Sequence, residues 1–135
     1  MHQILVIDDE CDVRDSVKCV LDLAGYMVAT AANATEALEQ LGRVPTDLVI
    51  TDIIMPKIDG VQAIRMIREA FPRVRIVAIS GGGNFGAAAY QPTAIKTNAY
   101  LASAQEAGAH MVLIKPFEAE DLLEAVESVL GVGHA

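Results

Sequence analysis

The chain has 135 residues, a length that favours one domain with its own hydrophobic core over residues 1–135. Its composition is 53% hydrophobic and only 4% aromatic, which excludes a disordered chain and predicts small aliphatic side chains packed between helices and a sheet. A net charge of −8 argues against direct binding to nucleic acid or an anionic membrane, because both require clustered cations. No apolar run is long enough to span a membrane and the start lacks a signal peptide, so we expect a soluble, cytoplasmic protein.

Short apolar runs alternate with helical stretches along the chain. The runs, each of which predicts a strand, are Ile4–Ile7, Met27–Ala29, Leu48–Ile50, Arg75–Ile79 and Met111–Ile114. The predicted helices are one with an apolar stripe from Val13 to Ala24, one from Asn33 to about Gly42, one from Asp59 to before Pro72, an Ala-rich one leading to Gly108, and one with its apolar face from Leu122 to Leu130. Five strand–helix units with short connections predict an α/β fold, with a parallel sheet covered by helices on both faces.

One stretch does not fit this pattern. From Gly81 to about Lys96 the chain is rich in Gly and Ala and shows neither a strand nor a helical stripe. Loops of this length in a compact domain usually serve a function or move. The sequence does not assign its conformation.

Polar residues follow the ends of four predicted strands. Asp8 and Asp9 follow the first, Asp52 the third, Ser80 the fourth and Lys115 the fifth. The carboxyl ends of parallel strands meet at one edge of a sheet, where ligands bind in open α/β folds. We therefore expect three carboxylates, a hydroxyl and an ammonium group to gather at one edge.

Three crowded carboxylates are unfavourable on their own, since two unit charges about 4 Å apart repel by about 4 kcal/mol at an effective dielectric constant near 20. Either one carboxylate takes up a proton or a cation binds. Mg²⁺ prefers one or two carboxylates together with waters and phosphate oxygens, so the set predicts a site for Mg²⁺ and a phosphoryl group. Any single aspartate at a strand end has another interpretation, in which it caps the following helix.

Over nearly its whole length, the chain resembles the response-regulator receiver domains of bacterial two-component signalling. The matching motifs are Ile-Leu-Val-Ile-Asp8-Asp9-Glu10, the stretch from Asp47 through Asp52 and Pro56 to Gly60, Val77-Ala-Ile-Ser80-Gly81, and Lys115-Pro116-Phe117. The resemblance implies a flavodoxin-like (CheY-like), doubly wound sheet of five parallel strands in the order 2-1-3-4-5 with five helices.

The resemblance also implies roles for the acidic residues. Asp52 would be the phosphoacceptor, whose carboxylate attacks phosphorus to give an aspartyl phosphate. Mg²⁺ would be bound by Asp9, by Asp52 and by the backbone carbonyl of Ile54, while Asp8 would act through a coordinated water.

Two further residues would contact the phosphoryl group. Lys115 would pair with one of its oxygens, and Ser80 would donate a hydrogen bond to another once phosphate is attached, which moves the Ser80 loop. The peptide bond between Lys115 and Pro116 is cis in the family.

The chain also departs from the family pattern. Val112 stands where an aromatic residue is usual on the fifth strand, and the loop after Ser80 is longer than usual, so we expect a rearranged output surface. Ile54 and Gly82 stand where members of the family tune phosphate lifetime. Neither side chain can orient a water, which predicts a comparatively long-lived phosphate.

Several functional hypotheses remain at the level of sequence. In the first, a stand-alone receiver takes phosphate from a sensor histidine kinase or a histidine-phosphotransfer protein and acts on an unknown downstream protein, with phosphotransfer to its own Asp52 as its only catalysis. The second is a Mg²⁺-dependent phosphohydrolase that forms an aspartyl phosphate, although the expected Asp-x-Asp is replaced by Asp8-Asp9-Glu10. The others are a binding scaffold that no longer accepts phosphate, and the receiver fragment of a larger regulator.

Overall fold

The computed structural model describes residues 2–53, 60–80, 106–114 and 118–131. Its elements follow in the order β1 (Gln3–Ile7), α1 (Cys11–Leu23), β2 (Met27–Ala31), α2 (Ala34–Arg43), β3 (Leu48–Asp52), α3 (Gly60–Ala70), β4 (Arg75–Ser80), β5 (Met111–Ile114) and α5 (Ala119–Leu130). The five strands form one parallel sheet in the order β2-β1-β3-β4-β5. The expected α/β class and strand order are confirmed.

The helix expected before Gly108 falls mostly outside the described residues, as does the stretch from Gly81 to Lys96. Only residues 106 and 107 of that helix are described, and both are helical. The remaining helices, α1, α2, α3 and α5, lie in the expected places. Within the described part of the chain, no helix combines the length and apolar character needed to cross a membrane.

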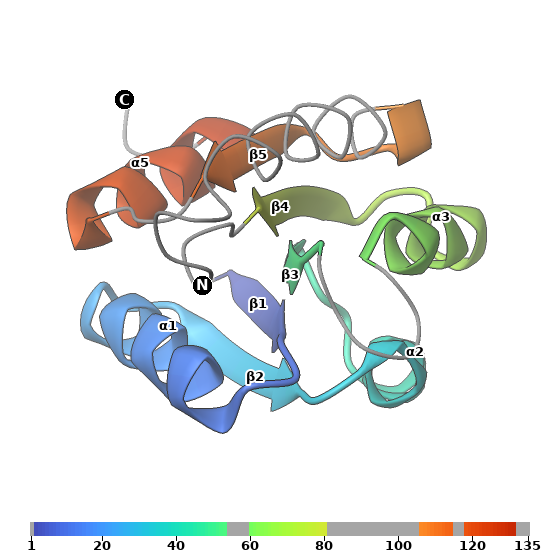
Figure 1. Ribbon diagram of the computed structural model, residues 1–135, viewed down its shortest axis with the longest axis horizontal. Helices are drawn as coiled ribbons and strands as arrows, with labels where there is room; N and C mark the ends of the chain where they lie inside the picture. The colour runs from blue at the N-terminus through green and yellow to red at the C-terminus, as the bar shows by residue number, and fades with distance from the viewer. Residues whose placement is uncertain (1, 54–59, 81–105, 115–117, 132–135) are drawn as a thin grey trace, which may run out of the picture.

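Helices cover both faces of the sheet, with α1 and α5 on one face and α2 and α3 on the other (Figure 1). Alternate residues of β1 supply the two cores, because successive side chains of a strand point to opposite faces. Ile4 and Val6 pack with residues of α1 and α5, whereas Leu5 and Ile7 pack with residues of α2 and α3. Burial on both faces explains why the central strands are continuous apolar runs rather than alternating ones.

Local sequence signals explain several helix ends. The Asn33 side chain accepts a hydrogen bond from the Glu36 N–H at 2.9 Å and so caps α2 at the residue where the sequence predicted that this helix starts. At the start of α5, Asp121 accepts from the Glu118 N–H at 2.9 Å, a contact that the sequence reading did not anticipate. The start expected at Asp59 for α3 lies outside the described residues.

Three strands continue beyond the apolar runs that predicted them. β2 ends at Ala31, β3 at Asp52 and β4 at Ser80. The pairing of Asp52 with Ile79 shows that the backbone ladder continues past the last apolar residue. The apolar pattern shows only which side chains are buried. Hydrogen bonds between strands involve the backbone of any residue, so a strand can continue past its last apolar residue.

Candidate functional site

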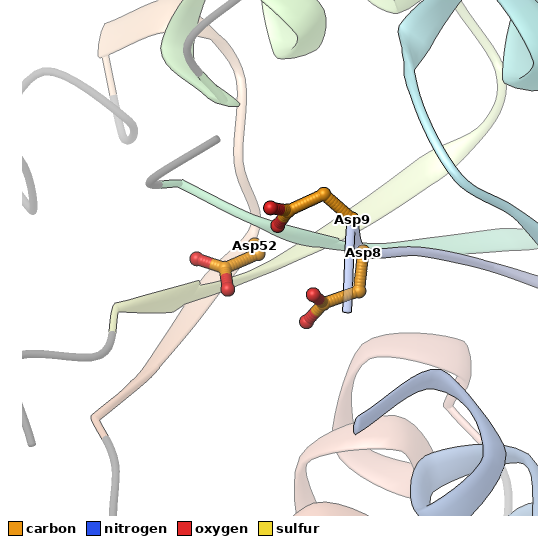
Figure 2. A group of neighbouring side chains, drawn as sticks. All are labelled: Asp8, Asp9 and Asp52. Carbon is orange, nitrogen blue, oxygen red and sulfur yellow. The ribbon is translucent and has the colours of Figure 1, made fainter. Parts of the chain in front are cut away.

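The acidic residues meet where β1 and β3 lie side by side. Ile7, the last residue of β1, pairs with Thr51, so Asp8 and Asp52 emerge next to each other at the carboxyl edge of the sheet. Asp9 follows in the connection to α1. Figure 2 shows the carboxylates of Asp8, Asp9 and Asp52 turned to the same side, beyond the ends of these strands.

The three carboxylates form one compact group, which we call the acidic cluster: Asp8, Asp9 and Asp52. One oxygen of each lies within 4.8 Å of the others. Asp8 is 2% exposed and Asp52 7% exposed, whereas Asp9 is exposed to solvent. The sequence predicted this convergence of the three aspartates.

The backbone before Asp52 is fixed by the middle of the sheet. Thr51 is completely buried, and its hydroxyl donates to the Asp52 carbonyl at 3.1 Å. The N–H of Ile53 donates to the Ile79 carbonyl at 2.9 Å, which ties the residue after Asp52 to β4. Asp52 therefore emerges from a rigid, buried strand rather than from a loop.

Asp8 also contributes to the local backbone. Its Oδ1 accepts from the Glu10 N–H at 2.9 Å, just before α1 begins. One oxygen of Asp8 thus orders the turn into the helix by accepting from the N-cap residue Glu10, which is not the contact to a first-turn N–H that would cap α1.

The structure places the remaining predicted site residues less completely. Ser80 is the last residue of β4, and β4 lies beside β3, so its backbone reaches the same edge as Asp52. Lys115 would follow β5 directly, but Lys115, Ile54 and Gly82 lie outside the described residues. Val112, at the position expected to be aromatic, is half-buried and packs against the core beneath α2 and α3.

The donor set fits a hard divalent cation. An octahedral Mg²⁺ holds oxygens at about 2.1 Å, which places neighbouring ligands about 3 Å apart and opposite ligands about 4.2 Å apart. The spacing of up to 4.8 Å within the acidic cluster is close to that arrangement. Two of these carboxylates are nearly excluded from water, so their mutual repulsion is poorly screened and a bound cation would relieve it.

Arg14 lies beside the site, and no motif in the sequence assigned it a role. Its Nη1 donates to the backbone carbonyl of Asp8 at 2.8 Å, and its side chain is half-buried. A signal was available in the sequence, because Arg14 lies near the start of α1, where the helix dipole disfavours a cation. A local conflict of this kind often marks a residue retained for another purpose.

Comparison with known proteins adds independent information. The profile of the response regulator receiver domain matches residues 4–127. The chain is 32% identical over 130 residues to the chemotaxis protein CheY of Bacillus subtilis (strain 168), covering 96% of this chain and 98% of that protein. It is 34% identical over 130 residues to the response regulator receiver protein CpdR of Brucella abortus (strain 2308), with the same coverage.

A solved structure agrees with these relatives. The receiver domain of NtrX from Brucella abortus superimposes with a TM-score of 0.80 at 33% identity, and the match covers 96% of this chain and 99% of that one. The similarity therefore extends over the acidic cluster and over both faces of the sheet.

Proposed function

This chain belongs to the family of response regulator receiver domains, and on that premise we propose that residues 1–135 are one receiver domain that accepts a phosphoryl group on Asp52. The observation that carries the proposal is the acidic cluster, whose oxygens from two separate strand ends lie within 4.8 Å of one another. A nucleophilic carboxylate next to two further carboxylates requires a cation before it can approach a phosphate dianion.

In this proposal Asp9 and Asp52, together with the Ile54 carbonyl, would hold Mg²⁺, and Asp8 would act on it through a water. When bound, Mg²⁺ neutralises the charge that develops on the transferred group. The hydrogen bond from the Glu10 N–H supports an indirect contact for Asp8, since it engages one of the two carboxylate oxygens. The exposed carboxylate of Asp9 supports direct access from solvent.

The reaction is an in-line displacement at phosphorus. A carboxylate oxygen of Asp52 forms the new bond to phosphorus, and the bond from phosphorus to the donor nitrogen breaks, leaving the electron pair on an imidazole that takes up a proton. The Lys115 ammonium pairs with one oxygen of the transferred group. The Ser80 hydroxyl donates to another, and the resulting shift of its loop transmits the signal.

A phosphohistidine donor implies a sensor histidine kinase or a histidine-phosphotransfer protein as partner. The signal then passes by protein contact to a downstream protein, without binding to nucleic acid or membrane. The proposal places this exchange in the cytoplasm and limits the catalysis of the chain to its own phosphorylation.

The test is incubation of the full chain with acetyl phosphate and Mg²⁺, followed by measurement of the intact mass. We expect one added phosphoryl group on the wild-type chain and none after Mg²⁺ is chelated. Asp52→Asn should remain unlabelled because an amide oxygen is a poor nucleophile. Asp47→Asn is the matched control and should be labelled normally, since this carboxylate precedes the same strand but accepts from the Gln3 N–H at the opposite edge of the sheet.

Two results would contradict the proposal. Labelling of Asp52→Asn as complete as that of the wild-type chain would assign the phosphoryl group to another residue. Steady turnover of a chromogenic phosphoester, well above that of Asp52→Asn, would favour the phosphohydrolase instead.

A further inference from the structure

The connection between β1 and α1 carries two members of the acidic cluster, and several hydrogen bonds hold its backbone. The Asp8 N–H donates to the Ala31 carbonyl at 3.1 Å, which continues the β1–β2 ladder. The Glu10 N–H donates to the Asp8 carboxylate at 2.9 Å. The third contact comes from a side chain of α1, because the Arg14 guanidinium donates to the Asp8 carbonyl at 2.8 Å.

This third contact acts on the peptide unit that joins Asp8 to Asp9. Because a peptide unit is planar, holding the Asp8 carbonyl fixes the direction of the Asp9 N–H and the position of the Asp9 Cα, from which the side chain extends. The bond joins a charged donor to a carbonyl at 2.8 Å, which places it among the stronger protein hydrogen bonds. The half-buried Arg14 side chain also has less freedom to leave than an exposed one.

The Asp9 carboxylate itself is not held in the same way. Within the described ranges it has no hydrogen bond or ion pair with another side chain or backbone group. Its place within 4.8 Å of the Asp52 oxygens therefore depends on the backbone that carries it. The Arg14 guanidinium restrains this backbone at the Asp8 carbonyl.

We propose that Arg14 is a positioning residue for the divalent cation: it holds the Asp8–Asp9 peptide so that the Asp9 carboxylate faces Asp52. The inference rests on the proposed function for the identity of the cation, but not on phosphoryl transfer. Arg14 touches neither the cation nor the phosphoryl group, and acts through the backbone of its neighbours.

The charge of Arg14 makes the proposal sharply testable. A guanidinium beside the acidic cluster repels a divalent cation, so removing only its charge should strengthen Mg²⁺ binding. Loss of its positioning role should weaken binding, because Asp9 would no longer be preorganised. Replacement by a neutral side chain of similar length thus has opposite effects under the two explanations.

The experiment is a calorimetric titration of unphosphorylated protein with Mg²⁺, for the wild-type chain and for Arg14→Met, Arg14→Lys and Arg75→Met. Arg75→Met is the matched control, because the Arg75 Nη1 also donates to a backbone carbonyl at 2.8 Å, that of Val129. Arg75 begins β4, at the edge of the sheet opposite the acidic cluster. Thermal unfolding of each variant without Mg²⁺ separates the cost in stability from the cost in binding.

We expect Arg14→Met to bind Mg²⁺ about tenfold more weakly, at the lower end of the losses seen when groups that orient metal ligands are removed. Arg14→Lys should recover part of this loss, since an ammonium can donate a hydrogen bond but lacks the planar fork. Arg75→Met should bind as the wild-type chain does, even if its melting temperature falls.

Mg²⁺ binding by Arg14→Met that equals or exceeds that of the wild-type chain would overturn the inference while leaving the proposed function intact. If Arg14→Met does not fold, Arg14→Lys decides, and wild-type affinity in that variant overturns the inference. A wild-type chain that binds Mg²⁺ but is not labelled at Asp52 refutes the proposed function alone. A wild-type chain that binds no Mg²⁺ refutes both.

Discussion

Gly108 shows how one residue constrains the approach to β5. Its φ of +129° lies in a region that side chains rarely adopt. An ideal Cβ at this position would lie 2.5 Å from the Arg68 Cγ. Arg68 cannot move away without cost, because its Nη1 donates to the Pro72 carbonyl at 2.9 Å. Backbone conformation and packing therefore both require glycine at this position.

Gly108→Ala is expected to lower the free energy of unfolding by about 2 kcal/mol, from the backbone strain of a non-glycine residue at this φ and from displacement of Arg68. Urea denaturation measures the change. Gly42→Ala is the matched control, since a Cβ there meets nothing within 4 Å inside α2. It should raise stability by up to about 1 kcal/mol, because alanine favours a helix over glycine. Equal effects of the two substitutions would contradict this account.

At the scale of elements, His110 joins β5 to β4. Its backbone N–H donates to the Ile76 carbonyl at 2.7 Å, and its Nδ1 accepts from the Ile76 N–H at 3.1 Å. The imidazole thus takes the place of a backbone carbonyl as the acceptor for this N–H, just before the residues that pair between β4 and β5. Partial burial, and then the positive charges of Arg68 and Arg75, lower the pKa of His110 below its ordinary value. A protonated Nδ1 could not accept the Ile76 N–H.

This arrangement predicts a pH dependence of stability. Because the pKa of His110 is lower in the folded chain than in the unfolded chain, the unfolded state takes up the proton first as the pH falls. The stabilising contribution is therefore complete above about pH 6.5, the unfolded value, and is lost as the pH falls through the lower folded value.

This contribution is measured by chemical denaturation of the wild-type chain and of His110→Gln at several pH values between about 7.5 and about 5, an interval that brackets the ordinary pKa of histidine. The wild-type chain should lose more stability over this interval than the variant. Carboxylates titrate in both proteins, so the difference between them reports His110. A steeper loss in His110→Gln would reverse the assigned direction.

At the scale of the whole molecule, the sheet separates the sources of stability from the site. Two apolar cores lie on the two faces of the sheet, and the acidic cluster lies at the carboxyl edge of the strands, with Asp9 exposed to solvent. Folding therefore forces three carboxylates together, and packing elsewhere offsets their repulsion. A cation that binds only this folded arrangement must stabilise the entire domain.

We expect Mg²⁺ to raise the melting temperature of the wild-type chain. The free energy of unfolding should rise by about 1.4 kcal/mol for each tenfold increase in Mg²⁺ concentration above the dissociation constant. Asp52→Asn should be more stable than the wild-type chain when Mg²⁺ is removed, because one repulsive charge is gone, and should gain less when Mg²⁺ is added. Thermal unfolding with chelator and with increasing Mg²⁺ tests both effects. Equal gains in the two proteins would place the cation elsewhere.

The sequence by itself located the described strands and helices and identified the three aspartates that meet in the acidic cluster. Apolar runs located all five strands, because burial on both faces demands continuous aliphatic side chains, and the motifs around Asp8, Asp9 and Asp52 indicated the family. These signals are local, so they can be recognised along the chain without knowledge of distant contacts.

Only the tertiary structure decided how distant parts fit together. No apolar run or helical stripe in the sequence indicates the three contacts that matter most. These are the distances within the acidic cluster, the hydrogen bond from the Ile76 N–H to the His110 imidazole, and the hydrogen bond from Arg14 to the Asp8 carbonyl. Each depends on where a side chain ends in space after strands and helices have packed. The sequence thus specified which groups are present, and folding fixed their separations, on which the chemistry depends.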